Sequence, residues 1–125
     1  MAKILVVDDN ELVRATTRSI LEGAGHEVRD ANDGDSALKI VAGAPFDLVL
    51  TDIVMPNKEG IGLIIELRRA GYKGAIIAMS GGGKIGPSDL LTMARKLGAN
   101  DCMPKPFHRA DLLSKVAACL KSEGG

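Results

Sequence analysis

Three carboxylates follow two short apolar runs of this chain. Asp8 and Asp9 come directly after the run at residues 4–7, and Asp52 follows the run at residues 48–51. If the two runs form neighbouring parallel strands, the three carboxylates meet at one edge of the sheet. Two like unit charges ~4 Å apart repel by roughly 4 kcal/mol at an effective dielectric of about 20, so such a cluster calls for a cation. The residue types predict a magnesium site, because Mg²⁺ prefers oxygen ligands and needs only one or two carboxylates when a phosphate also binds.

Asp52, Ser80 and Lys105 have the chemistry that phosphoryl transfer requires. A carboxylate such as Asp52 can attack phosphorus and form an acyl phosphate. Transfer depends chiefly on positioning and on neutralising oxyanion charge, which Lys105 and bound magnesium would supply. Ser80 follows a further apolar run and can donate its hydroxyl to a phosphoryl oxygen. Either Asp8 or Asp9 alone could instead be a helix N-cap, but capping requires only one carboxylate.

Five short apolar runs alternate with longer amphipathic stretches, and these elements must position the reactive side chains. The predicted strands are residues 3–7, 27–31, 47–51, 74–79 and 100–103, with the polar second strand at a sheet edge. The predicted helices are residues 10–24, 33–42, 60–70, 87 or 88 to 97, and 109–120. In the last helix the inward positions are expected at Leu113, Val116, Ala117 and Leu120. The pattern indicates one open α/β sandwich whose ligands bind at the carboxyl ends of the strands.

Composition excludes several classes of function. The length of 125 residues suits one domain, and 16 basic residues balance 16 acidic ones, so no basic excess indicates nucleic-acid binding. Apolar runs are far shorter than the ~20 residues of a membrane span. Cys102 and Cys119 do not form a C-x-x-C motif, and they are predicted to be small buried side chains. Two unpaired thiols suit a reducing compartment, so a cytoplasmic location is expected.

Taken together, the motifs closely resemble the response-regulator receiver domain of two-component signalling. The residues that carry the resemblance are 6–10 (VVDDN), 51–56 (TDIVMP) with Gly60, Ser80, and 103–107 (MPKPF). The resemblance covers essentially the whole chain. It implies a flavodoxin-like (βα)5 three-layer α/β sandwich with a parallel sheet in the order 2-1-3-4-5. It also implies a single receiver domain over residues 1–125 without an output domain.

The resemblance further implies a role for each site residue. Asp52 is the expected phosphoacceptor, and the expected donor is a histidine kinase, a histidine phosphotransfer protein or a small acyl phosphate. Mg²⁺ is the expected cofactor, with ligands from Asp9, Asp52 and the backbone carbonyl of Val54, while Asp8 acts through water. The residues expected to hold the phosphoryl group are Ser80 and Lys105. The chain would catalyse its own phosphorylation and dephosphorylation and so alter the binding of a downstream protein partner, without direct nucleic-acid contact or membrane insertion.

The chain departs from the family pattern near the expected switch. The family carries an aromatic side chain three residues before the lysine, whereas Cys102 stands there and has no ring to rotate. The segment 81–87 (GGGKIGP) contains four glycines and predicts a mobile loop, whose ordering is a hypothetical substitute for that rotation. The same loop matches G-x-G-x-x-G, but no acidic residue follows at the spacing that a ribose requires, so nucleotide binding is not predicted.

Two other functions fit parts of the sequence. Cys102 is compatible with a phosphorylation-independent binding module that retains the acidic site. A magnesium-dependent phosphohydrolase would also form an aspartyl phosphate, but such enzymes carry a second Asp two positions after the nucleophile. Here Asn10 stands two positions after Asp8. The receiver interpretation accounts for more of the chain.

Overall fold

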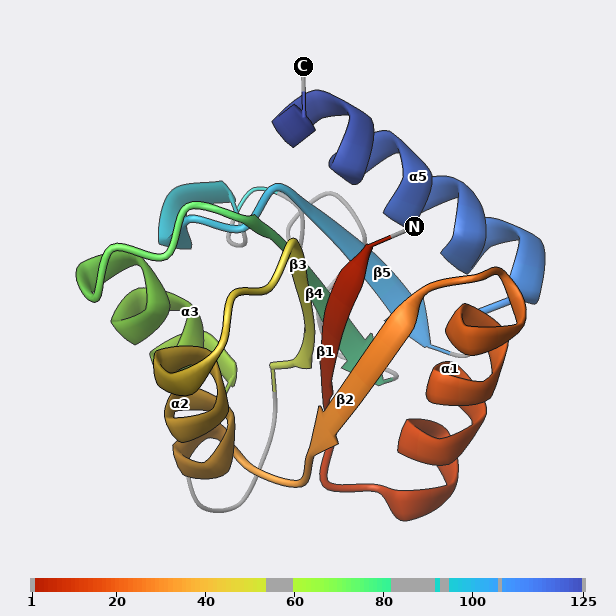
Figure 1. The fold of residues 1–125 in the computed structure, drawn as a ribbon, viewed down its shortest axis with the longest axis horizontal. Helices are drawn as coiled ribbons and strands as arrows, with labels where there is room; N and C mark the ends of the chain where they lie inside the picture. The colour runs from red at the N-terminus through yellow and green to blue at the C-terminus, as the bar shows by residue number, and fades with distance from the viewer. Residues whose placement is uncertain (1, 54–59, 82–91, 93–94, 106, 125) are drawn as a thin grey trace.

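The protein is described by a computed structural model for residues 2–53, 60–81, 92, 95–105 and 107–124 (Figure 1). Its strands are β1 (Lys3–Val7), β2 (Glu27–Ala31), β3 (Leu48–Asp52), β4 (Ala75–Gly81) and β5 (Asp101–Lys105). Its helices are α1 (Glu11–Gly23), α2 (Gly34–Gly43), α3 (Gly60–Arg69) and α5 (Arg109–Gly124). Residues 92 and 95–97 are helical, and most of the helix predicted to begin at residue 87 or 88 lies outside the described residues. Within the described ranges, no helix is both long enough and apolar enough to cross a membrane.

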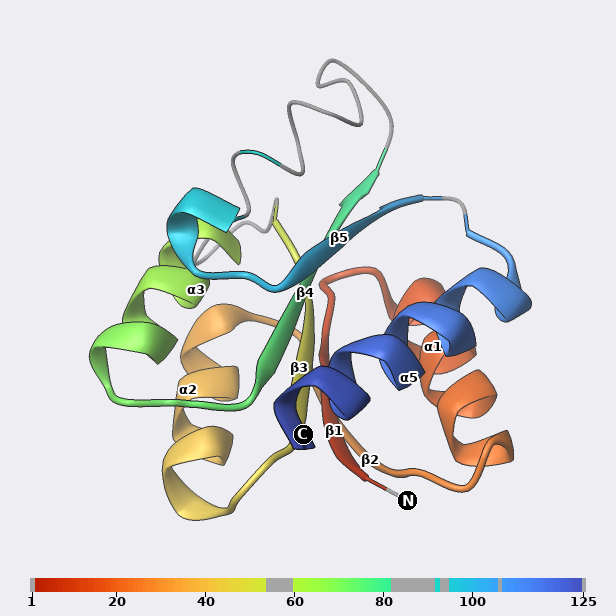
Figure 2. The same cartoon turned by 90° about the horizontal axis from the view of Figure 1, so that it is seen from above.

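The strands form one parallel sheet in the order β2-β1-β3-β4-β5, which confirms the predicted flavodoxin-like topology. Helices α2 and α3 cover one face, and α1 and α5 cover the other (Figures 1 and 2). The strand order reverses between β1 and β3, since their connections lead to opposite faces of the sheet. Ligands of open α/β sheets bind at the carboxyl ends of the strands beside this reversal.

Two apolar clusters fill the spaces on either side of the sheet. Leu5 and Val7 of β1 belong to the cluster beneath α2 and α3, whereas Ile4 and Val6 belong to the cluster beneath α1 and α5. Successive side chains of a strand point to opposite faces, so a strand covered on both faces is apolar at every position. The second strand differs, because Glu27 and two further residues of β2 remain outside the core. Its polar character therefore reflects its place at the edge of the sheet, as predicted.

The inward face of α5 includes Val116, as predicted, but it is centred on Leu112, while Leu113 and Leu120 pack only partly against the core. Leu112 and Val116 are fully buried and Cys119 is nearly so, while Leu113 is half-buried and Ala117 is exposed. Both stripes have helical spacing, because the segment 112–120 is apolar over more than half of its circumference. The choice between them depends on contacts with α1 and the sheet, which the helix sequence does not contain. Cys102 and Cys119 are both buried thiols, as predicted.

The corrected register of α5 leads to a test with neighbouring leucines. We expect Leu112→Ala to lower the free energy of unfolding by about 2–5 kcal/mol, because it leaves a cavity in the core. Leu113→Ala should cost distinctly less, because Leu113 retains contact with solvent. Urea denaturation of both variants measures the difference. Equal losses, or a greater loss for Leu113→Ala, would contradict the observed register.

Candidate metal and phosphoryl site

The turn after β1 is organised by Asn10 as the N-cap of α1. The Oδ1 atom of Asn10 accepts a hydrogen bond of 3.0 Å from the backbone N–H of Val13. The N–H of Asn10 in turn donates to Oδ1 of Asp8 at 2.9 Å. A capping role for Asp8 or Asp9 is thereby excluded, because the cap is already provided. The carboxylates of Asp8 and Asp9 are therefore not explained by helix capping.

The parallel register of the sheet brings Asp8 and Asp52 side by side. Val7 of β1 pairs with Thr51 of β3, so the residue that follows each of them lies at the same edge. One ligand oxygen each from Asp8, Asp9 and Asp52 lies within 4.8 Å of the others. Asp8 is fully buried, Asp52 is 7% exposed, and Asp9 is open to solvent. The carboxylates that the sequence singles out therefore form one cluster with one accessible side.

Lys105, at the end of β5, bridges the two buried carboxylates. Its Nζ atom donates to Oδ2 of Asp8 at 2.7 Å and to Oδ2 of Asp52 at 3.2 Å. Burial by itself lowers the pKa of Lys105, but the hydrogen bond with Asp8 and the charge of Asp52 outweigh it and raise that pKa above its usual value. While the carboxylates are ionised, the raised pKa of Lys105 consequently contributes stability that is fully present below the ordinary lysine pKa. On the alkaline side, this contribution is lost as the pH rises through the raised pKa of Lys105.

The charges of the site do not balance. Among the described residues of this edge, three carboxylates meet one ammonium group, which leaves an excess of two negative charges. Oxygen ligands with excess negative charge in a partly buried setting suit a hard divalent cation such as Mg²⁺. The donor set therefore fits the magnesium ion that the sequence predicts.

Two predicted site residues, Ser80 and Val54, are described only in part or not at all. Ser80 lies on β4, where its backbone pairs with Pro104 of β5, but its side chain is outside the described structure. Val54 and the glycine-rich residues 82–87 also lie outside the described residues. Cys102 is buried in the cluster beneath α2 and α3. The structure thus brings together Asp8, Asp9, Asp52 and Lys105, and the predicted contributions of Ser80 and Val54 stay predictions.

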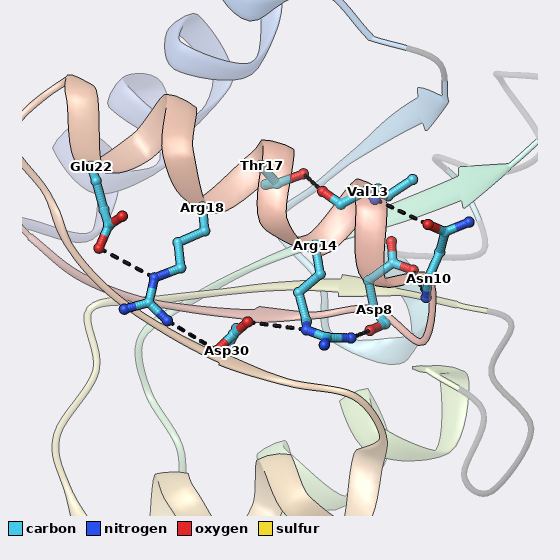
Figure 3. A network of polar contacts seen from close by, with 8 residues as sticks. All are labelled: Asp8, Asn10, Val13, Arg14, Thr17, Arg18, Glu22 and Asp30. Carbon is cyan, nitrogen blue, oxygen red and sulfur yellow. Dashed lines mark hydrogen bonds and ion pairs between the residues drawn. The ribbon is translucent and has the colours of Figure 1, made fainter.

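Sequence reasoning overlooks Arg14, which contacts the acidic turn from α1 (Figure 3). Its Nη1 atom donates to the backbone carbonyl of Asp8 at 2.9 Å, and its Nε atom donates to Asp30 of β2 at 3.0 Å. A signal was available, because helical side chains lean toward the helix N-terminus. An arginine one turn after the N-cap is therefore placed to reach back to the preceding turn.

Comparison with known proteins decides the family. The sequence profile of the response regulator receiver domain matches residues 4–117. The chain belongs to the response regulator receiver family. A structure of a CheY-like receiver domain from Methanospirillum hungatei superposes with a TM-score of 0.90 at 27% identity, covering 99% of this chain and 97% of that one. The chemotaxis protein CheY4 of Vibrio cholerae gives a TM-score of 0.85 at 30% identity, covering 95% of this chain and 98% of that one.

Curated relatives include larger signalling proteins. The CAI-1 autoinducer sensor kinase/phosphatase CqsS of Vibrio cholerae is 40% identical over 116 residues, which are 93% of this chain and 17% of that protein. The transcriptional regulatory protein CpxR of Escherichia coli is 33% identical over 121 residues, which are 97% of this chain and 50% of that protein. The chain thus spans half or less of these relatives, and its similarity to them is that of a receiver domain.

The charge imbalance predicts an effect on stability. Without divalent cations, Asp9→Asn should raise the free energy of unfolding by about 1 kcal/mol, because it removes one partner of a repulsive pair near solvent. It should also reduce the stabilisation that added Mg²⁺ gives, because one ligand is lost. Denaturation in EDTA and in excess Mg²⁺ measures both effects. Asp111→Asn, which changes an exposed carboxylate of α5, is the control; destabilisation by Asp9→Asn in EDTA would refute the repulsion.

Proposed function

We propose that the chain is a phosphorylation-dependent switch in which Asp52 accepts a phosphoryl group with the help of Mg²⁺. The observation that carries the proposal is the bridge from Lys105 to both Asp8 and Asp52 in a cluster with excess negative charge. One ammonium group neutralises only one carboxylate, so charge balance within the protein does not explain why this cluster contains three. The surplus of carboxylates destabilises the free protein, and function explains such a cost better than stability does.

The hydrogen bonds favour different roles for Asp8 and Asp9. Both side-chain oxygens of Asp8 are engaged, Oδ2 by Lys105 and Oδ1 by the N–H of Asn10. Asp9 is exposed at the open side of the cluster. We infer that Asp9 and Asp52, with the carbonyl of Val54, hold the ion directly. Asp8 supports it through water and holds Lys105 in place.

The transfer step follows from the position of Asp52. A carboxylate oxygen of Asp52 attacks the phosphorus of a phosphohistidine or an acyl phosphate from the open side. The new O–P bond forms as the bond from phosphorus to the donor atom breaks, and the donor leaves with that electron pair. Lys105 exchanges its bond to Asp52 for one to a phosphoryl oxygen, while Ser80 donates to another. Bound Mg²⁺ supplies further neutralisation of the phosphoryl oxygens. Attack of water on the phosphorus later breaks the O–P bond to Asp52, which releases inorganic phosphate and regenerates the carboxylate.

The donors and partners follow the same chemistry. A histidine kinase or a histidine phosphotransfer protein is the proposed donor, because receiver-like sequence occurs in a sensor kinase/phosphatase and in transcriptional regulators. The proposed output is altered affinity for a downstream protein. Since Cys102 is buried and has no ring, the change of shape cannot depend on aromatic rotation at that position. Because Gly81 already belongs to β4, ordering of the following residues 82–87 is the proposed alternative.

Phosphorylation of Asp52 can be tested with a small phosphodonor. Incubation with acetyl phosphate and Mg²⁺ should add one phosphoryl group to the wild type, detected by intact-protein mass spectrometry. Asp52→Asn should abolish the adduct, because an amide is not a competent nucleophile. Asp111→Asn should be labelled like the wild type, and EDTA should prevent labelling of both. Equal labelling of Asp52→Asn and wild type would exclude Asp52 as the phosphoacceptor.

A constitutive binding module is the second candidate, and the burial of Cys102 in place of an aromatic residue is the observation that favours it. The two candidates differ in how a captured partner responds to a beryllofluoride mimic of the phosphoryl group. A switch should change its partner affinity, whereas a constitutive module should not.

A further inference from the structure

Arg14 joins the acidic turn to the neighbouring edge strand. Its guanidinium group donates from Nη1 to the backbone carbonyl of Asp8 and from Nε to Oδ2 of Asp30. The side chain is only 18% exposed, so both bonds are largely shielded from solvent. The planar fork of arginine can satisfy two acceptors in fixed directions at once. Asp8 is thus held through its main chain by Arg14 and through its side chain by Lys105 and Asn10.

A chain of ion pairs with alternating charges leads from Arg14 toward solvent (Figure 3). Asp30 accepts from Arg14 through Oδ2 and from Arg18 through Oδ1, and Arg18 also pairs with Glu22. Exposure rises outward, because the side chains of Arg18 and Glu22 are 40% and 47% exposed. Exposed pairs of this kind contribute little to stability. The inner bond of Arg14 to the Asp8 carbonyl is the one that reaches the site.

We propose that Arg14 is a positioning residue for the metal site, and that its bridge between Asp30 and the Asp8 carbonyl sets the affinity for Mg²⁺. The carbonyl of Asp8 belongs to the peptide group that leads directly into Asp9. Holding that carbonyl fixes the main chain from which the Asp9 side chain projects toward the other carboxylates. Groups that orient metal ligands without touching the metal typically change metal affinity by about 10- to 100-fold when removed. The inference rests on the proposed function, because it concerns the same metal site.

Electrostatics alone predicts the opposite outcome. Arg14 carries a positive charge near a site for a cation, so its neutralisation should strengthen Mg²⁺ binding if only charge matters. Lysine at the same position keeps the charge but cannot reproduce the planar fork that bridges Asp30 and Asp8. The positioning role therefore predicts weaker binding for both Arg14→Gln and Arg14→Lys, and the sign of the change separates the two explanations.

The experiment titrates Mg²⁺ alone into the metal-free full chain by isothermal titration calorimetry. Arg14→Gln and Arg14→Lys should each raise the dissociation constant by about 10- to 100-fold relative to the wild type. Arg18→Gln, which removes a guanidinium one turn further along the same helix face, should leave it unchanged. The amide signals of Asp9 and Asn10 in metal-free NMR spectra should move in the Arg14 variants and not in Arg18→Gln. Urea denaturation in EDTA establishes that each variant is folded before titration.

The possible results are separable. A dissociation constant of Arg14→Lys equal to that of the wild type, or tighter binding by Arg14→Gln, would overturn the positioning role while leaving the proposed function intact. A loss of unfolding free energy in the Arg14 variants with unchanged Mg²⁺ affinity would show a purely structural role and also overturn it. Absence of Mg²⁺ binding and of Asp52 labelling in the wild type would overturn the proposed function, and this inference with it.

Discussion

The ammonium group of Lys105 reaches two carboxylates from distant parts of the chain. It lies 97 residues from Asp8 and 53 residues from Asp52, and it donates to both. Asp8 is fully buried, and a buried charge without a partner would be strongly destabilising. The ends of β1, β3 and β5 must therefore meet at one edge for the fold to be stable. The same requirement assembles the receiver site.

Charge is distributed differently at the two edges of the sheet. At the carboxyl edge, the carboxylates of the cluster outnumber the ammonium group of Lys105, and this imbalance favours a cation. At the opposite edge, Arg68 donates to the carbonyls of Tyr72, Gly74 and Gly98 and so fastens the segments that enter β4 and β5. Those bonds are satisfied within the protein. The fold thus gathers unbalanced negative charge at the carboxyl edge and places satisfied hydrogen bonds of Arg68 at the opposite edge.

The acidic turn shows how several weak contacts determine one geometry. Asn10 caps α1, Arg14 holds the carbonyl of Asp8, and the N–H of Asp8 donates to Ala31 of β2 at 3.2 Å. Each contact by itself contributes on the order of 1 kcal/mol. Together they hold the main chain of Asp8 in the position from which its carboxylate accepts a hydrogen bond from Lys105. Cys102 lies on β5, three residues before Lys105, and its side chain packs in the apolar cluster beneath α2 and α3.

The sequence by itself determined the five-strand α/β pattern, the edge position of β2 and the convergence of Asp8, Asp9, Asp52 and Lys105. Those features depend on short-range periodicity and on the rule that parallel strands end at a common edge, and both can be read along the chain. Only the tertiary structure decided that α5 buries Leu112 rather than Leu113, because two apolar stripes of one helix compete and the neighbouring elements select between them. It also decided that Arg14 reaches the acidic turn through Asp30, since that bridge exists only once α1 has packed beside β2.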